Sequence, residues 1–102
     1  MSRYIESYNH NHRIGVLIEF RATDDFTFRT KEFQALAKDI AIHIVARDPA
    51  RDGQSVLSLL GQRFVKDESK SVLEVLQDCE AQLKGDVRVL RYVRYAIDDA
   101  DQ

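Results

Sequence analysis

Cysteine, proline and glycine are scarce in this chain of 102 residues, which has one Cys, one Pro, four Gly and no Trp. The single cysteine, Cys79, excludes an intrachain disulfide and is typical of a reducing compartment. No apolar run approaches the roughly 20 residues that a membrane span needs. The opening residues, MSRYIESYNHNH, contain no apolar signal core. We therefore expect a cytoplasmic protein that does not insert into a membrane.

An excess of one charge is also missing, because 15 basic residues stand against 17 acidic ones and the net charge is −2. Such a balance gives no general attraction for nucleic acid, so we expect no direct nucleic-acid partner. Arg88, Arg91 and Arg94 recur at every third position of a predicted strand, which places them on different faces.

Catalytic and metal-binding patterns are absent too. The sequence has no glycine-rich phosphate loop, no nucleophile with a neighbouring base and no metal-ligand spacing. His10 and His12 alone are a weak metal signal and are better explained as a polar turn. We expect no cofactor, no metal and no enzymatic activity, so function should come from binding.

What the chain does have is the composition of an ordinary globular protein, with 44% hydrophobic and 31% charged residues. Length and composition predict a single domain over residues 1–102 without internal repeats. A domain of this size leaves some apolar surface for a partner to cover.

Alternating side chains predict two strands near the N-terminus. Residues 3–8 alternate weakly, which favours an edge strand, and residues 9–12 are turn-forming. Ile14, Val16, Ile18 and Phe20 alternate cleanly and give the strongest strand signal of the chain. A hairpin of these two strands follows.

Helical patterns occupy the middle of the chain. Thr30 is the predicted N-cap of a helix that ends before Pro49. Its apolar stripe recurs at three- and four-residue spacing and comprises Phe33, Leu36, Ala37, Ile40, Ala41 and Ile44. A short helix is expected from Val56 to Leu60.

A third helix and a long strand complete the prediction. Ser71 and Glu74 form a capping box, and Gly85 is placed for a left-handed turn at the helix end. The β-branched and aromatic run from Val87 to Ile97 predicts a strand.

The resulting order is β-β-α-α-α-β. We expect an α+β domain in which a three-stranded antiparallel sheet carries the helices packed on one face. Leu17, Leu90 and Tyr92 are assigned to the other face, where an apolar patch would mark a dimer or partner surface.

Almost the whole chain, from about Tyr4 to Ile97, resembles the core domain of elongation factor Ts. The matching text is IGVLIEF, an Asp-Asp-Phe loop, FQALAKDIAIHIVA, FVKDESKSV and the strand VRVLRYVRY. Members of that family carry IGVLVE, a Thr-Asp-Phe loop, FxxLAKDIAMHIAA, FVKDPSKTV and VVRRFVRFE at the corresponding places. The family's N-terminal helical module and its helical insertion after the Asp-Pro stop have no counterpart in this sequence.

The resemblance implies a function in translation elongation. Elongation factor Ts binds the GTPase elongation factor Tu and promotes GDP release, with an Asp-Phe pair that enters the GTPase near its nucleotide. Asp25 and Phe26 match that pair. The resemblance thus implies a polar disruptor at Asp25 and an aromatic wedge at Phe26.

The loop departs from the family pattern at three positions. Asp24 replaces the usual Thr, Thr27 replaces the usual Val, and Phe28 replaces a small residue. Asp24 and Phe28 are therefore included as candidate partner-binding residues, and Phe28 is a candidate to share the aromatic contact. From the residues alone the loop has another interpretation, in which Asp24 or Asp25 caps a turn and Phe26 packs on the core.

His43 is the last candidate for partner binding. The family has a histidine there, near a helix end that faces the partner, whereas the residues alone favour a half-buried histidine with satisfied hydrogen bonds. Two functions stay open: GDP release from elongation factor Tu, with a possible homodimer, or an exchange-inactive interaction module, for example a ribosome-associated one.

Overall fold

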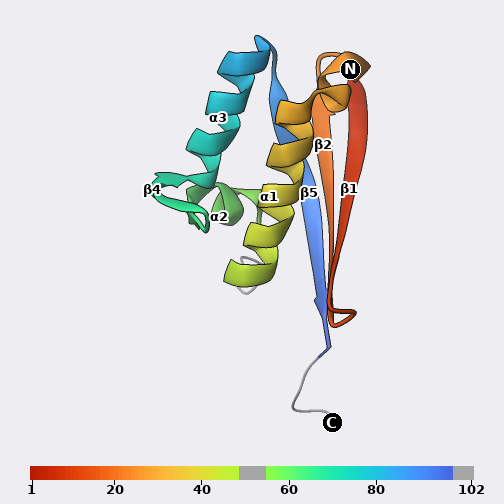
Figure 1. Cartoon of the computed structure of the whole chain (residues 1–102), viewed down its shortest axis with the longest axis vertical. Helices are drawn as coiled ribbons and strands as arrows, with labels where there is room; N and C mark the ends of the chain where they lie inside the picture. The colour runs from red at the N-terminus through yellow and green to blue at the C-terminus, as the bar shows by residue number, and fades with distance from the viewer. Residues whose placement is uncertain (49–54, 98–102) are drawn as a thin grey trace.

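The computed structural model describes residues 1–48 and 55–97 and confirms the α+β class, with helices over one face of a three-stranded sheet (Figure 1). Its elements, in chain order, are β1 (Ser2–His10), β2 (Ile14–Ala22), η1 (Asp25–Arg29), α1 (Lys31–Arg47), α2 (Val56–Gly61), β3 (Arg63–Phe64), β4 (Asp67–Ser71), α3 (Val72–Leu83) and β5 (Val87–Ala96).

The three long strands are antiparallel in the order β1-β2-β5. β1 lies at an edge, as predicted, but continues to His10. The chain turns at Asn11 and His12, whose φ angles of 55° and 59° are left-handed. Two consecutive residues of this kind give the tight turn whose twist matches that of a hairpin.

A β-bulge divides β5. Glu19 pairs with Arg91 and Phe20 pairs with Val89, so Leu90 is an extra residue on β5. The bulge reverses the expected alternation beyond this point, and Tyr92 is buried on the side of the helices. The prediction that Tyr92 lies on the open face with Leu17 is therefore wrong, while Leu17 is exposed there.

Helix α1 begins as predicted, because the Thr30 hydroxyl accepts a hydrogen bond from the Phe33 amide at 3.2 Å. It ends at Arg47, and Asp48 follows with a left-handed φ of 44°. Pro49, which was expected to stop this helix, lies outside the described residues.

The segment between α2 and α3 contains a small hairpin, β3–β4, that the sequence did not predict. The capping box of α3 is confirmed, since the Ser71 hydroxyl accepts from the Glu74 amide and the Glu74 carboxylate accepts from the Ser71 amide. The left-handed residue at its end is Lys84, with a φ of 55°, and not Gly85. Gly85 instead donates its amide proton to the Glu80 carbonyl, because it occupies the second position of the cap.

One apolar core lies between the sheet and the helices. The apolar stripe predicted for α1 is buried in it, together with Val16, Ile18 and Phe20 of β2. Helix α3 contributes Leu76 and Cys79, which are buried, and Val75, which is half-buried. Within residues 1–48 and 55–97, every helix is too short or too polar to span a membrane.

Candidate functional site

The loop between β2 and α1 forms a short 3₁₀ helix, η1, that is closed by its own hydrogen bonds. The Asp24 carboxylate accepts from the Thr27 amide at 3.2 Å and from the Thr27 hydroxyl at 3.4 Å. The Thr30 hydroxyl donates to the Thr27 carbonyl at 2.8 Å while also capping α1. The loop is therefore tied directly to the start of α1.

Phe28 attaches this loop to the core. Its side chain is buried and stacks on Tyr4 of β1, with ring centroids 5.2 Å apart. It also meets Phe33 of α1 edge to face at 5.0 Å. Such aromatic pairs stabilise beyond the area that they bury, so Phe28 holds η1 against both β1 and α1.

Phe26 points away from the core and is 71% exposed. A 3₁₀ helix turns by about 120° per residue, so side chains two positions apart diverge, and burial of Phe28 directs Phe26 to solvent. Asp25 is exposed beside it, and within the described part of the chain its carboxylate has no hydrogen-bond or ion-pair partner. An acidic and an aromatic side chain thus share one solvent-facing surface.

The observed positions of Asp24, Phe26 and Phe28 distinguish between the two interpretations of the loop. Asp24 caps the turn, as one interpretation required. The aromatic residue that packs on the core is Phe28 and not Phe26. Phe26 is largely exposed in the free domain, as the aromatic wedge implied by the resemblance requires.

His43 lies in the interior and links α1 to the β3–β4 hairpin. Its Nδ1 accepts a hydrogen bond from the Val65 amide at 3.1 Å, and its Nε2 lies 2.9 Å from the Gln62 side-chain oxygen. The ring stacks on Phe64 at 5.9 Å. Because Nδ1 must accept, the neutral ring carries its proton on Nε2.

Burial lowers the pKa of His43, the hydrogen bond to Gln62 opposes this shift, and the charge of Arg47 adds to it. The neutral form is therefore the one that fits its hydrogen bonds and its surroundings. The side chain has no exposed surface, so it is more deeply buried than the half-buried histidine that we expected.

Phe28 and His43 are therefore not on the surface of the free domain, and their assignment as partner-binding residues stays a prediction. Neither side chain is accessible in the conformation observed. Both support the surface from within: Phe28 fixes η1, and His43 fixes the hairpin against α1.

Two supporting residues escaped the sequence analysis. Tyr4 provides the ring on which Phe28 stacks, and its alternation out of phase with Ile5 was the available signal. Gln62, the partner of His43, stands 19 positions away, and no local pattern connects the two residues.

The described residues contain no group of three or more His, Cys, Asp or Glu side chains that could hold a metal ion. Cys79 is buried, and burial raises the pKa of its thiol, with smaller contributions from Glu32 and Glu80. A buried thiol of this kind is a poor nucleophile.

Comparison with known proteins identifies the family of this chain. Residues 1–55, just over half of the chain, match the family model described as "Elongation factor TS". The chain belongs to the elongation factor Ts family. Its site residues 24–28 and 43 all lie within the matched segment.

Curated relatives extend the similarity to most of the chain. It is 30% identical to elongation factor Ts of Rubrobacter xylanophilus, over 91% of this chain and 69% of that protein. It is 30% identical to elongation factor Ts of Geobacter metallireducens, over 91% of this chain and 62% of that protein. A chloroplastic polyprotein of EF-Ts from rice (subspecies indica) is 27% identical, again over 91% of this chain.

The shared part is a fraction of these longer proteins. The chain spans 12% of the rice polyprotein and 62% of the Geobacter protein. The alignment with the Rubrobacter protein covers 135 residues, more than the 102 of this chain, so that relative has additional residues inside the aligned region. Family membership places the chain among translation elongation factors.

Proposed function

We propose that this chain binds an elongation factor Tu-like GTPase in the cytoplasm and promotes release of GDP from it. The observation that carries the proposal is Phe26, a 71% exposed aromatic side chain on a loop that Phe28 and Asp24 hold in place. Family membership supplies the class of partner.

Phe26 has the properties of a binding anchor. A phenylalanine ring buries a large area while losing only two rotatable bonds, and such anchors dominate many interfaces. The capping bonds of Asp24 and Thr30 order the backbone of η1 before binding. Binding therefore does not have to repay the entropy of ordering this loop.

The proposed role of Asp25 is to disturb the nucleotide site of the GTPase and not to anchor the complex. Its unpaired carboxylate stands next to the anchor, where it can compete for polar groups that organise a bound nucleotide and its metal. By linkage, a partner that binds the nucleotide-free GTPase more tightly must lower nucleotide affinity by the same factor. The chain thus acts by binding and not by bond chemistry.

Affinity for nucleotide-free elongation factor Tu measures the anchor directly. Phe26→Ala should weaken binding by about 2 kcal/mol or more, as loss of a hot-spot aromatic does. Leu57→Ala is the matched control, because Leu57 is 81% exposed on α2, outside η1. Equal affinity of the two variants would refute the assignment of Phe26.

The same affinity measurement tests whether Phe28, and not Phe26, is the aromatic wedge. If Phe28 had taken over the wedge, Phe28→Ala would lose more affinity per folded molecule than Phe26→Ala. Binding without acceleration of GDP release would instead indicate the exchange-inactive interaction module.

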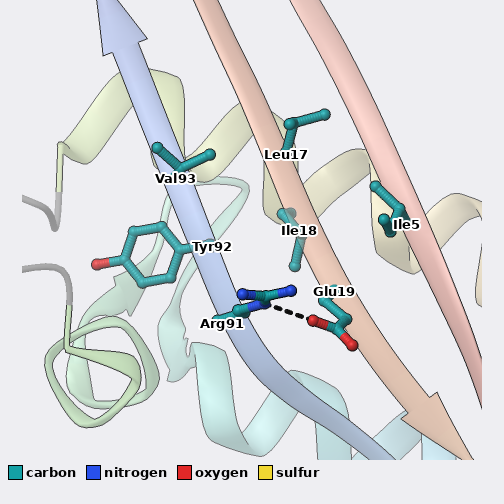
Figure 2. Close-up of a pocket in the computed structure, with 7 residues that line it drawn as sticks. All are labelled: Ile5, Leu17, Ile18, Glu19, Arg91, Tyr92 and Val93. Atoms are coloured by element: carbon teal, nitrogen blue, oxygen red, sulfur yellow. Dashed lines mark hydrogen bonds and ion pairs between the residues drawn. The ribbon is translucent and has the colours of Figure 1, made fainter.

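A second candidate function is self-association through the open face of the sheet. Ile5, Leu17, Val93 and Tyr95 are 63%, 48%, 40% and 77% exposed. Figure 2 looks onto this face, with the helices behind the strands. We propose that two copies meet there; sedimentation equilibrium at micromolar concentrations should show dimers, and monomers alone would exclude them.

A further inference from the structure

The bulge at Leu90 gathers arginine side chains at one end of the open sheet face. Arg21 pairs with Arg3 on one side and with Arg88 on the other, and Glu19 pairs with Arg91. Glu19 and Arg21 share a face of β2 because they are two residues apart. Arg88 and Arg91 therefore lie on the same face, which corrects the expectation from their spacing. We call Arg3, Arg21, Arg88 and Arg91 the arginine corner.

The arginine corner has fewer carboxylates than guanidinium groups. Glu19 is the single carboxylate on this face of β1, β2 and β5. It accepts from Arg91 Nε at 2.6 Å (Figure 2) and from Arg3 Nη1 at 3.3 Å. The hydrogen bond from Arg91 lowers the pKa of Glu19 and keeps it ionised.

Arg21 and Arg88 are left facing each other. Neither has an ion-pair partner among residues 1–48 and 55–97. Like charges directly opposite on neighbouring strands are destabilising, so this pair gains from an external anion. Four guanidinium groups and one carboxylate leave three positive charges unbalanced at the corner.

Three carboxylates follow the other end of the same sheet. Asp98, Asp99 and Asp101 come directly after Ile97 in the sequence. They cannot reach Arg21 and Arg88 of their own chain, because β5 separates Ile97 from Arg88 by about 30 Å at ~3.3 Å per residue. Four residues beyond Ile97 extend by at most ~14 Å. A second copy can bring these carboxylates to Arg21 and Arg88.

We propose that the arginine corner binds the acidic segment Asp98–Asp101 of a second copy, which rests on the self-association proposed above. Two sheets stacked with their strands reversed place each corner over the far end of the other sheet, and the two-fold axis makes both contacts equivalent. Strands running the same way would bring two arginine corners together. Charge thus selects the reversed orientation.

The middle of the open sheet face is apolar, as packing against a second sheet requires. Two shallow depressions of about 390 and 280 Å³ lie along it, and both are lined by Leu17 and Val93. Ile5 lines the first and Tyr95 the second. Apolar side chains of a second sheet would cover this region, while the charged groups at each end set the orientation.

A charge-swap experiment tests the contact in the full chain. The corner variant is Arg21→Glu with Arg88→Glu, and the acidic-segment variant is Asp98→Lys with Asp99→Lys. Each alone should weaken dimerisation in sedimentation equilibrium by at least tenfold at 50 mM salt. An equimolar mixture should recover it, because both contacts of the mixed dimer regain opposite charges.

The control carries the same change of charge as the corner variant, at positions outside the sheet. Lys31→Glu with Lys38→Glu alters exposed positions of α1 and should leave dimerisation unchanged. High salt should weaken the wild-type dimer and reduce the differences between variants.

The outcomes distinguish the two proposals. A wild-type chain that stays monomeric overturns self-association and this contact together. A wild-type dimer that is insensitive to both variants overturns the contact alone. Loss of dimer with the corner variant but not with the acidic-segment variant shows that a different part of the second copy occupies the corner. Failure of the mixture to recover likewise overturns the assignment.

Discussion

Loop η1 and the surroundings of His43 both contain candidate partner-binding residues, yet they differ in solvent exposure. In η1, Phe26 and Asp25 are on the surface. At the other region, His43 is closed in by Gln62, Val65 and Phe64 and has no exposed surface. One region presents side chains to solvent, and the other holds secondary structure elements together.

The difference shows that similarity to a motif does not determine accessibility. Phe26 and Phe28 are two residues apart on the same short helix, and one is exposed while the other is buried. Their exposure depends on Tyr4 and Phe33, which come from other elements. Substitutions at buried positions should therefore reduce stability, and substitutions at the exposed pair should reduce binding.

The largest expected effect is at Phe28. Phe28→Ala removes a buried ring that contacts two other aromatic rings, and should reduce the free energy of unfolding by about 3–5 kcal/mol. Phe26→Ala should change it by less than about 0.5 kcal/mol, because the ring is exposed. Urea denaturation of both variants measures the contrast, and equal losses would remove the distinction between the two rings.

The second largest expected loss of stability is at His43. His43→Leu keeps an apolar side chain in the core but leaves the Val65 amide and the Gln62 amide oxygen without their partner. We expect a loss of about 2 kcal/mol in the free energy of unfolding. Amide hydrogen exchange should be faster at Val65 than in wild type, and unchanged exchange there would show that this bond does not hold the hairpin.

A smaller effect depends on pH. The pKa of His43 is lowered in the folded protein, so the unfolded chain binds more protons between the two pKa values. The free energy of unfolding should be highest above the unfolded pKa of about 6.5 and fall as the pH drops below it. Denaturation curves from pH 7.5 to 5.5 should show this slope in wild type and a weaker one in His43→Leu.

Among the side chains that pack or hydrogen-bond within the domain, the smallest expected effect on stability is at the cap of η1. Asp24→Ala removes the acceptor for the Thr27 amide and should cost about 1 kcal/mol. Because the loop is then less ordered, binding to elongation factor Tu should also weaken, although Asp24 need not touch the partner. Asp24→Asn, which keeps an acceptor, should restore most of both properties.

Much of the fold could be predicted from local patterns. The stripe of α1, the capping box of α3 and the alternation of β2 each use neighbouring residues, and all three were confirmed. The bulge at Leu90, the β3–β4 hairpin and the bond between His43 and Gln62 depend on distant residues. The wrong assignment of Tyr92 followed from the bulge, and the deeper burial of His43 from the hairpin.

Release of labelled GDP from elongation factor Tu tests the central claim most directly. Wild-type chain should accelerate release. Phe26→Ala should require about thirtyfold more protein for the same rate, corresponding to a loss of about 2 kcal/mol in binding. Asp25→Ala should lower the maximal rate more than it lowers affinity. If wild type binds the GTPase without accelerating release, or if Phe26→Ala and Asp25→Ala both behave as wild type, the proposed function of the exposed pair is contradicted.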